Sequence, residues 1–565
     1  MQPADAVAFF RAQGVRGSRA EIEAACAPYG YHPLSLRLLA GLIVGDLQQP
    51  GDIAAAKRLD VSGDLVQRQH HVLEHAYASL TPARQNFLSR IACFRGAVSY
   101  EALQKTCEVS ETSQVFEADL RDLLARGLLH RDEKTNRFDL HPIVRRYAYD
   151  RLTASDRSAA HTQLRDYFAA VPAPGKVQTL DDLMPVIELY HHTVRAGQYD
   201  EARTLFHDRI SSAVYFQFGA YQLQTELLRA LFPDGEDRPP RLKDESDQAW
   251  TLNSLANSYS LNGQPRRAVP LFEQHNAISE KAGDKKNLAT GLGNVATQQM
   301  IIGALKAAEA NLRHRIDLCR EIEDEFREAI GHQELGRLLA YRGVWEESAS
   351  ELAAGRSKFE KRKNVQGQGV NWAYRALRAL LISRDKTSEV SETSEVFNAA
   401  LSAARRALEL ADETALTSYP GERDYVQAYW LLGAAHRLNG DLAEAERHLS
   451  EALTRCRNIN LVEFEADILL DLARLRADQN EREEALRLAE EALLIAERSD
   501  YVLQGAGVHL FLAQTALKDG DRATAVEHAK EARRLATCDG PPDYTYTVAY
   551  DEAGALLRES VISNQ

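Results

Sequence analysis

Turn residues recur in this chain at intervals of forty positions, and small residues accompany each of them at fixed distances. A small residue lies seven positions before each turn, and Ala or Ser lies five positions after it. Two antiparallel helices approach closely only where neither carries a bulky side chain, and Gly or Asn readily ends a helix in the left-handed conformation. The turns are Gly263, Gly303, Gly343, Gly440, Asn480 and Gly520. This spacing predicts an array of helical hairpins.

The flanking positions agree in all six hairpins, and we expect them where the two helices cross. The small residues before the turns are Ala256, Ala296, Gly336, Gly433, Ala473 and Ala513. The small residues after the turns are Ala268, Ala308, Ser348, Ala445, Ala485 and Ala525. Because a repeat of this kind buries its apolar face only on its neighbours, the pattern predicts an elongated array.

Two segments interrupt the regular spacing. The interval between Gly343 and Gly440 is 97 residues, and the residues in excess of two periods fall in a polar stretch at 383–396. Its many Ser, Thr and Glu residues predict a loop or a frayed helix start. Residues 233–246 contain three prolines and five acidic residues. We expect this second segment to bend or interrupt the array.

Composition restricts the class of protein. With 565 residues the chain exceeds what one hydrophobic core supports, so several domains or a repeat array are expected. Charged residues make up 27% of the chain and hydrophobic residues 44%, and no apolar run is long enough to span a bilayer. The first residues lack the basic start and apolar stretch of a secretory signal. We therefore expect a cytoplasmic protein without a membrane partner.

Cysteines, histidines and net charge argue against several functions. The six cysteines are scattered singly, without the paired spacing of a zinc site or the density of a disulfide framework. His71 and His75 flank Glu74 as in some zinc proteases, but no third ligand is evident, and we expect no metal site. A net charge of −14 argues against broad affinity for nucleic acid. No nucleophile and base stand out, so we expect no enzymatic activity from this chain alone.

The hairpin pattern resembles the tetratricopeptide repeat. The sequence Leu-Ala-Asn-Ser-Tyr at 255–259, followed by Ala268 and Phe272, is the best single match, and Gln-Tyr-Asp-Glu-Ala at 198–202 resembles an earlier repeat. The period of forty indicates helices longer than usual. The resemblance implies a right-handed α-superhelix over residues 181–560, with breaks at the two segments described above.

The first 150 residues resemble a different part of known proteins. The sequence Gly-Tyr-His-Pro-Leu-Ser-Leu at 30–36 is similar to a Gly-x-Pro-Leu motif of the STAND class of ATPases, the NB-ARC group included. Residues 73–96 are similar to the start of its winged-helix domain, and Leu-His-Pro at 140–142 resembles its Met-His-Asp motif. The resemblance implies an all-α protein with a small β wing near residues 129–140. Its parts are a helical remnant of the ATPase lid (1–45), a linker (46–69), a winged-helix domain (70–152) and a connector (153–180).

The STAND resemblance implies roles for two residues. Pro33 matches a proline that packs near the adenine of the bound nucleotide, and His141 matches a histidine that contacts a phosphate. Without that resemblance, Pro33 is a proline in the first turn of a helix, and His141 caps the helix that Pro142 opens. The Gly-rich phosphate loop with Lys and Ser or Thr is absent. We therefore expect no cofactor in this chain alone, and ATP or ADP only together with an ATPase core in cis or in trans.

The inner face of the predicted superhelix supplies a second candidate site. Positions ten and six residues before each turn lie on the first helix of each pair, where Asn can hold a peptide backbone, Arg a carboxylate and Trp an apolar group. The candidate partner-binding residues are Asn253, Asn257, Gln333, Arg337, Trp430, Arg437, Arg474 and Gln514. The alternative is that any such array has a polar inner face without a ligand.

Together these patterns predict a sensor. The array would bind a protein, a peptide or a small inducer, and the winged helix would relay the change to a nucleotide-binding core. The resemblance suggests phage defence or regulation of transcription as the output and is compatible with oligomerisation on activation. The alternatives are a stand-alone adaptor that scaffolds protein partners and a fragment of a transcription regulator. Binding to DNA is not expected, because the candidate recognition helix at 116–126 is rich in acidic residues.

Overall fold

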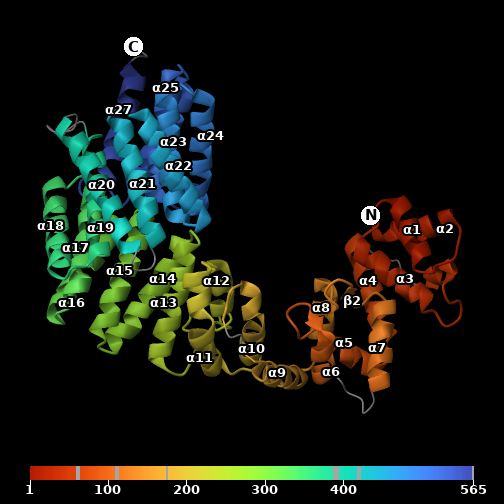
Figure 1. The fold of residues 1–565 in the computed structure, drawn as a ribbon. Helices are drawn as coiled ribbons and strands as arrows, with labels where there is room; N and C mark the ends of the chain where they lie inside the picture. Colours follow the sequence, from red (N-terminus) through yellow and green to blue (C-terminus); the bar gives the residue numbers. More distant parts are fainter. Residues whose placement is uncertain (59–63, 108–112, 173–175, 386–393, 416–420, 563–565) are drawn as a thin grey trace. The chain divides into compact units, whose positions relative to one another are not determined.

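The computed structural model describes residues 1–58, 64–107, 113–172, 176–385, 394–415 and 421–562. The chain divides into two compact units, Met1–Ile210 and Ser211–Gln565, and each has its own hydrophobic core (Figure 1). Within the described ranges, no helix combines the length and the apolar character needed to cross a bilayer. The predicted predominance of helices is confirmed.

The described residues of the first unit form short helices and three strands. Its elements before the second strand are α1 (Pro3–Ala12), α2 (Arg19–Cys26), the 3-10 helix η1 (Ala27–Tyr29), α3 (Pro33–Val44), the 3-10 helix η2 (Ile53–Arg58), α4 (Leu65–Ala78), α5 (Pro82–Ile91), β1 (Val98–Ser99), α6 (Tyr100–Cys107) and α7 (Ser113–Ala125). There follow β2 (His130–Asp132), β3 (Arg137–Asp139), α8 (Pro142–Asp150), α9 (Ala154–Ala169), the 3-10 helix η3 (Leu180–Leu183), α10 (Met184–Arg195) and α11 (Tyr199–Arg209).

The strands form one small antiparallel sheet in the order β1-β3-β2. Val98 of β1 and Arg131 of β2 both pair with Phe138 of β3, which is buried. Asp132 accepts a hydrogen bond from the backbone N–H of Lys134 (2.9 Å), and Asn136 takes a positive φ of 53°, so both residues shape the tight β2–β3 connection. The expected small β element at 129–140 is thereby confirmed.

The second unit is the helical array. It begins with the π-helix η4 (Ala213–Gln217), α12 (Tyr221–Arg229), α13 (Glu245–Leu261), α14 (Pro265–Lys281), α15 (Lys285–Ile301), α16 (Leu305–Glu321), α17 (Glu325–Tyr341), α18 (Trp345–Lys361) and α19 (Val365–Ile382). It continues with α20 (Ser394–Ala415), α21 (Gly421–Leu438), α22 (Leu442–Asn458), α23 (Val462–Asp478), α24 (Arg482–Arg498), α25 (Val502–Lys518), α26 (Arg522–Ala536) and α27 (Thr547–Ile562).

The hairpins have the predicted construction. Each of the six turn residues has a positive φ, for example 70° at Gly343 and 65° at Asn480. The small residues before and after the turns are buried at the helix crossings. A Cβ atom added to Gly336 would lie 2.7 Å from Leu352 Cγ, and one added to Gly433 would lie 2.6 Å from Leu449 Cγ. Bulkier residues there would force the two helices of a hairpin apart.

A second series of turns joins each hairpin to the next. Its residues also have positive φ, but most of them are not glycine: Gly283, Glu323, Lys363, Asn460 and Asp500. Most helices from α13 to α25 have 17 residues. Because three-residue turns separate them, helix and turn together span twenty positions and a hairpin repeat spans forty. The expectation of unusually long helices is confirmed.

The structure describes the first of the two predicted interruptions completely and the second only at its ends. Between α12 and α13, residues 230–244 form no helix, and Glu236 in this segment binds Arg229, Tyr259 and Arg267. The second segment lies largely outside the described residues, because 386–393 are not among them. Its last residues belong to α20, which has 22 residues and is longer than its neighbours.

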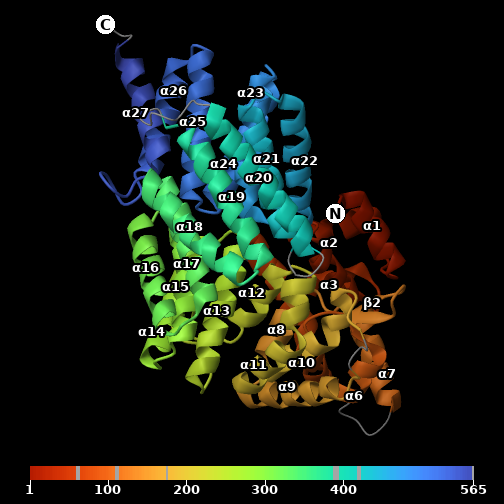
Figure 2. The same ribbon diagram turned by 60° about the vertical axis from the view of Figure 1, so that its left-hand side comes forward.

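The turns of the first hairpins lie against the last helices of the array (Figure 2). Thr547 Oγ1 at the start of α27 donates to the carbonyl of Arg342 (2.7 Å), and Arg342 Nε donates to the carbonyl of Asp543 (2.6 Å). The backbone N–H of Lys306 donates to Asp539 Oδ2 (2.7 Å). Side chains of the inner helices therefore meet in a narrow interior.

Candidate binding sites

The first unit contains a cavity of about 270 Å³ between the start of α3, the α7–β2 connection and the start of α8. Pro33 and His141, which are 108 positions apart in the sequence, both line it. The complete lining is His32, Pro33, Leu34, Arg37, Gly127, Leu128, Leu129, His130 and His141. The structure thus brings the two residues singled out by the resemblance into one site.

Both residues also stabilise helix starts. Pro33 is the first residue of α3, and His141 is the N-cap of α8, where its Nδ1 accepts a hydrogen bond from the N–H of Ile143 (3.3 Å). This bond leaves Nε2 of His141 as the nitrogen that carries the proton in the neutral ring. Since the N-terminal ends of two helices border the cavity, their dipoles favour a negatively charged group there.

Arg37 supplies the strongest positive charge of the cavity. Its Nη2 donates to the carbonyl of Leu129 (3.3 Å), and burial lowers the pKa of its guanidinium. The side chain passes close to Gly127, where a Cβ atom would lie 2.6 Å from Arg37 Cγ. Gly127 also has a positive φ of 72°, so both backbone conformation and space favour glycine at this position.

The lining is basic and contains no carboxylate. Arg37 is accompanied by His32, His130 and His141, and none of the nine lining residues is Asp or Glu. Burial, followed by the proximity of His32, lowers the pKa of His141. The His141 ring is therefore neutral at neutral pH and can donate one hydrogen bond from Nε2. Arg37 and this donor together suit an anion such as a phosphate.

The predicted inner-face residues of the array fall into three groups. At the start of the array, Asn253 Oδ1 accepts a hydrogen bond from Asn294 (3.0 Å), and Asn257 is half-buried. Further along, Gln333 and Arg337 are only 5% and 6% exposed. The remaining four, Trp430, Arg437, Arg474 and Gln514, lie near one another.

Arg337 is enclosed by its own neighbours. Its Nη2 lies 3.1 Å from Glu334 Oε2, and its guanidinium lies 4.9 Å from the ring centre of Tyr374. The hydroxyl of Tyr374 donates to the other oxygen of Glu334 (2.8 Å). Nevertheless Arg337 Nε and Nη2 and Gln333 Oε1 are buried without a hydrogen bond. This part of the interior therefore retains unused hydrogen-bonding capacity.

Trp430 belongs to the wall of the interior. It is 5% exposed, and its indole Nε1 donates to Asp471 Oδ2 (2.7 Å). Arg474 Nη1 donates to the other oxygen of Asp471 (2.8 Å). The carboxylate thus holds two of the predicted ligand-binding side chains in place. Trp430 offers little free surface as an anchor for an apolar ligand group.

Three arginines converge at the C-terminal end of the interior. Arg384, Arg437 and Arg474 line both a cavity of about 70 Å³ and a second cavity of about 340 Å³. Arg384 lies 3.2 Å from Glu552, which also accepts a hydrogen bond from Gln514 (3.2 Å). Burial, followed by the proximity of Arg384, lowers the pKa of Arg474. Glu552, Asp478 and Asp471 each pair with one of the three arginines and offset their charges.

The sequence did not single out Arg384, Asp467, Asp471 and Glu552. Arg384 lies at the edge of the polar stretch at 383–396, and Glu552 lies beyond the last turn. Asp467 and Asp471 occupy positions on α23 that differ from the two used for the inner face. Burial raises the pKa of Asp467 to about 7, although Gln504 donates a hydrogen bond to it. Asp467 and Asp471 would have been found only by a search for acidic residues on the same helix face as the inner-face positions.

Comparison with known proteins supports the repeats. A family model of the tetratricopeptide repeat matches residues 424–498, which lie in α21 to α24. This part of the chain is therefore assigned to tetratricopeptide repeats. No curated protein matches the chain.

Several solved structures are distantly similar. A Signal Transduction ATPase with Numerous Domains (STAND) protein with a tetratricopeptide repeat sensor from Pyrococcus horikoshii is 14% identical, with 100% of this chain and 74% of that chain covered at a TM-score of 0.36. A Rap protein complexed with competence and sporulation factor is 13% identical (61% and 93% covered, TM-score 0.39). The Rap conjugation gene regulator of plasmid pLS20, in complex with the Phr* peptide, is 11% identical (75% and 98% covered, TM-score 0.38).

Proposed function

We propose that this chain is the sensor and relay part of a STAND-type signalling ATPase. In this proposal the array binds a protein, a peptide or a small inducer, and a winged-helix domain in the first unit passes the change to a nucleotide-binding core. The observation that carries the proposal is the basic cavity that unites Pro33, Arg37 and His141. The strand order β1-β3-β2, with β1 placed before α6 and α7, is also what a winged-helix domain has.

The residues present fit part of a nucleotide. The cavity of about 270 Å³ is slightly smaller than typical sites for whole small-molecule ligands, which start at about 300 Å³. Arg37 and His141 would hold a phosphate, and Pro33 would contact the base. An ATPase core in cis or in trans would cover the remaining surface of the nucleotide. Without that core, the chain supplies only part of the site, so any nucleotide binding by the chain alone would be weak, and we propose no enzymatic activity for it alone.

The acidic face of α7 supports a protein contact over a DNA contact. Asp119 and Asp122 both pair with Arg84, at 2.8 and 3.1 Å, and Asp122 also pairs with Arg126 at 2.7 Å. The arginine charges of this face are thereby offset and do not form the concentrated positive surface that phosphate contacts need. Packing against an ATPase core is the use of the winged helix that these ion pairs favour.

Titration of the full chain with ADP, followed by calorimetry, tests the proposal. We expect weak binding that is lost in Arg37→Ala and in His141→Ala, because each removes one donor to the phosphate. His75→Ala, an exposed histidine of α4 outside the cavity, is the matched control and should bind as the unchanged chain does. Equal binding by all variants would overturn the assignment of the cavity.

The adaptor alternative predicts a different result. If ADP fails to bind at millimolar concentration, and native mass spectrometry of the chain from its own source shows only client proteins, the relay proposal is wrong. A complex with an ATPase polypeptide and a bound nucleotide would support it. The two measurements are independent, because the first tests the cavity and the second tests the partner.

A further inference from the structure

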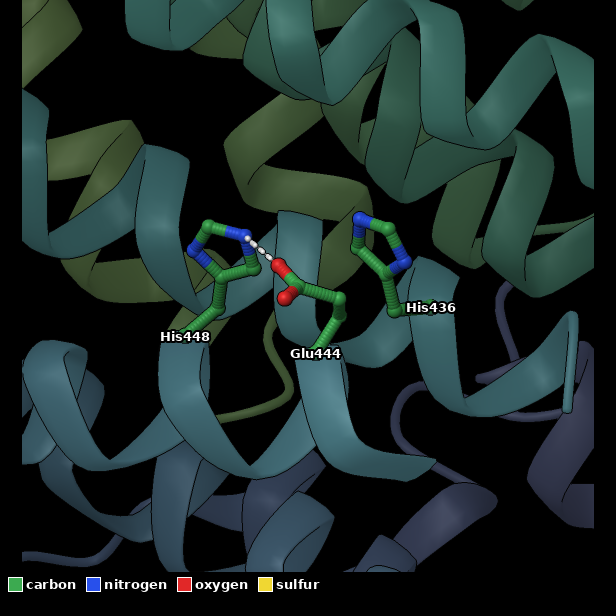
Figure 3. A group of neighbouring side chains, drawn as sticks. All are labelled: His436, Glu444 and His448. Atoms are coloured by element: carbon green, nitrogen blue, oxygen red, sulfur yellow. Dashed lines mark ion pairs between the residues drawn. The ribbon is translucent and has the colours of Figure 1, made fainter. Parts of the chain in front are cut away.

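One hairpin of the array carries two buried imidazoles and a carboxylate that converge on one point. His436 lies in the last turn of α21, and Glu444 and His448 lie one turn apart at the start of α22 (Figure 3). One potential metal-ligating atom from each residue lies within 4.8 Å of the other two. Glu444 Oε2 is 3.5 Å from His448 Nε2, and the two histidine ring centres are 5.4 Å apart.

The two imidazoles are buried, and Nε2 is the nitrogen of His448 that lies beside Glu444. His436 and His448 are 6% and 5% exposed, and Nδ1 of each ring is buried without a hydrogen bond. His436 Nδ1 also lies 3.3 Å from Asp441 Oδ2, in a geometry that makes no hydrogen bond.

The packing of the hairpin does not require these histidines. Forty positions later, the corresponding residues of the next hairpin are Arg476, Glu484 and Leu488. Glu484 keeps its partner Arg487 at 2.6 Å, just as Glu444 pairs with Arg447 at 2.5 Å. The carboxylate is thus common to both hairpins, and the two histidines are particular to one. A function specific to this hairpin explains them.

A side-chain cation already lies against two of the three residues. Arg447 Nη2 lies 2.9 Å from His448 Nε2 as well as 2.5 Å from Glu444 Oε2. The Arg447 side chain is 62% exposed, so it can turn into solvent when another cation binds. The ligand atoms therefore already face a positive group, and Arg447 competes with any metal ion.

We propose that His436, Glu444 and His448 bind one divalent ion of the Zn²⁺ class. Two imidazoles and a carboxylate are a common ligand set for zinc, whose tetrahedral bonds of about 2.0–2.1 Å place neighbouring ligand atoms about 3.3 Å apart. The separation of 3.5 Å between Glu444 and His448 is close to this value. Water completes the coordination. The ion joins the end of α21 to the start of α22 and stiffens this hairpin.

Zn²⁺ titration of the chelator-treated full chain by calorimetry tests the site. We expect the double variant His436→Gln, His448→Gln to bind one ion fewer than the unchanged chain. The single variant Glu444→Gln should bind that ion at least about 10-fold more weakly, since even outer ligands change metal affinity by about 10–100-fold. Glu484→Gln, the same substitution in the hairpin without histidines, is the matched control and should leave binding unchanged.

A second variant keeps the test decisive if the histidine substitutions disturb folding. Arg447→Ala removes the competing cation without removing a buried group, so we expect tighter Zn²⁺ binding. Co²⁺ in place of Zn²⁺ should give the visible absorption of a tetrahedral site in the unchanged chain and not in the double variant. The proposal is wrong if the double variant binds as many ions with the same affinity, or if Arg447→Ala has no effect on affinity.

Discussion

The arginines of the two candidate binding sites differ in the groups they contact. In the first unit, Arg37 donates to a backbone carbonyl, and the other ionisable side chains that line its cavity are histidines. In the array, Arg384, Arg437 and Arg474 each face a carboxylate. An unpaired cation accepts an anion directly, whereas a paired one must first give up its partner. If the proposed function holds, an anion would enter the first cavity without displacing a carboxylate, whereas a ligand of the array would have to rearrange an internal network of ion pairs.

The largest loss of stability is expected at Asp471, in the most buried part of the network of ion pairs inside the array. Asp471→Ala leaves the indole N–H of Trp430 and the guanidinium of Arg474 without their acceptor, and loss of one partner of a buried ion pair costs about 3 kcal/mol. Urea denaturation should show this loss. Asp478→Ala removes the more exposed partner of Arg437 and should cost less than about 1 kcal/mol. Equal losses would contradict the difference in burial.

A pH-dependent effect is expected at Asp467. Burial raises the pKa of this carboxyl to about 7, so the folded state binds the proton more tightly than the unfolded state. Stability is therefore lost as the pH rises toward 7 and through it. Asp467→Asn removes the ionisable group, so we expect this substitution to stabilise the protein more at pH 8 than at pH 5. Because the side chain is partly exposed to solvent, we expect the difference between the two pH values to be about 1 kcal/mol. A stabilisation independent of pH would contradict the assignment.

Substitutions in the cavity of the first unit should reduce ligand binding more than they reduce stability. His141→Ala removes the cap of α8, which costs about 1 kcal/mol, and Arg37→Ala removes one hydrogen bond to a carbonyl. Thermal unfolding should show only these small losses, while phosphate affinity falls strongly. If either variant unfolds the first unit, the cavity residues are structural and the contrast with the array disappears.

The smallest effect is expected at an exposed ion pair between distant hairpins. Arg266 lies 3.2 Å from Asp500, and both side chains are more than half exposed. Pairs of this kind contribute about 0.2–1 kcal/mol and are screened by salt. Arg266→Ala should therefore leave the unfolding midpoint nearly unchanged at high salt. A large loss would show that exposed pairs also belong to the network.

Local rules predicted the hairpins but not the contacts between them. Gly336 and Gly433 were placed correctly because a close helix crossing needs a small residue within the same hairpin. The turns at Glu323 and Lys363 were not predicted, because residues other than glycine adopt the left-handed conformation there. The pairing of Arg384 with Glu552 depends on the small rotation from each hairpin to the next, which accumulates over many repeats and leaves no pattern in the sequence.

The candidate sites were predictable to different degrees. Pro33 and His141 were singled out by resemblance alone, and the structure places them in one cavity, while their roles stay predictions. The inner-face rule located Arg437 and Arg474 but could not foresee that acidic neighbours already occupy them. His436 and His448 are twelve positions apart and on different helices, a spacing that matches no short metal-binding motif, and the sequence predicted no metal site.

The hydrogen bond between Thr547 and Arg342 has a consequence for folding. An open row of repeats unfolds from its ends, because the last unit touches only one neighbour. Here the last helix also holds a turn that lies 205 positions earlier in the sequence. Forming this contact requires closing a long loop, so it slows folding, and breaking it must accompany any fraying of α27. Amide hydrogens of α27 should accordingly exchange together with those near Arg342, as one cooperative unit.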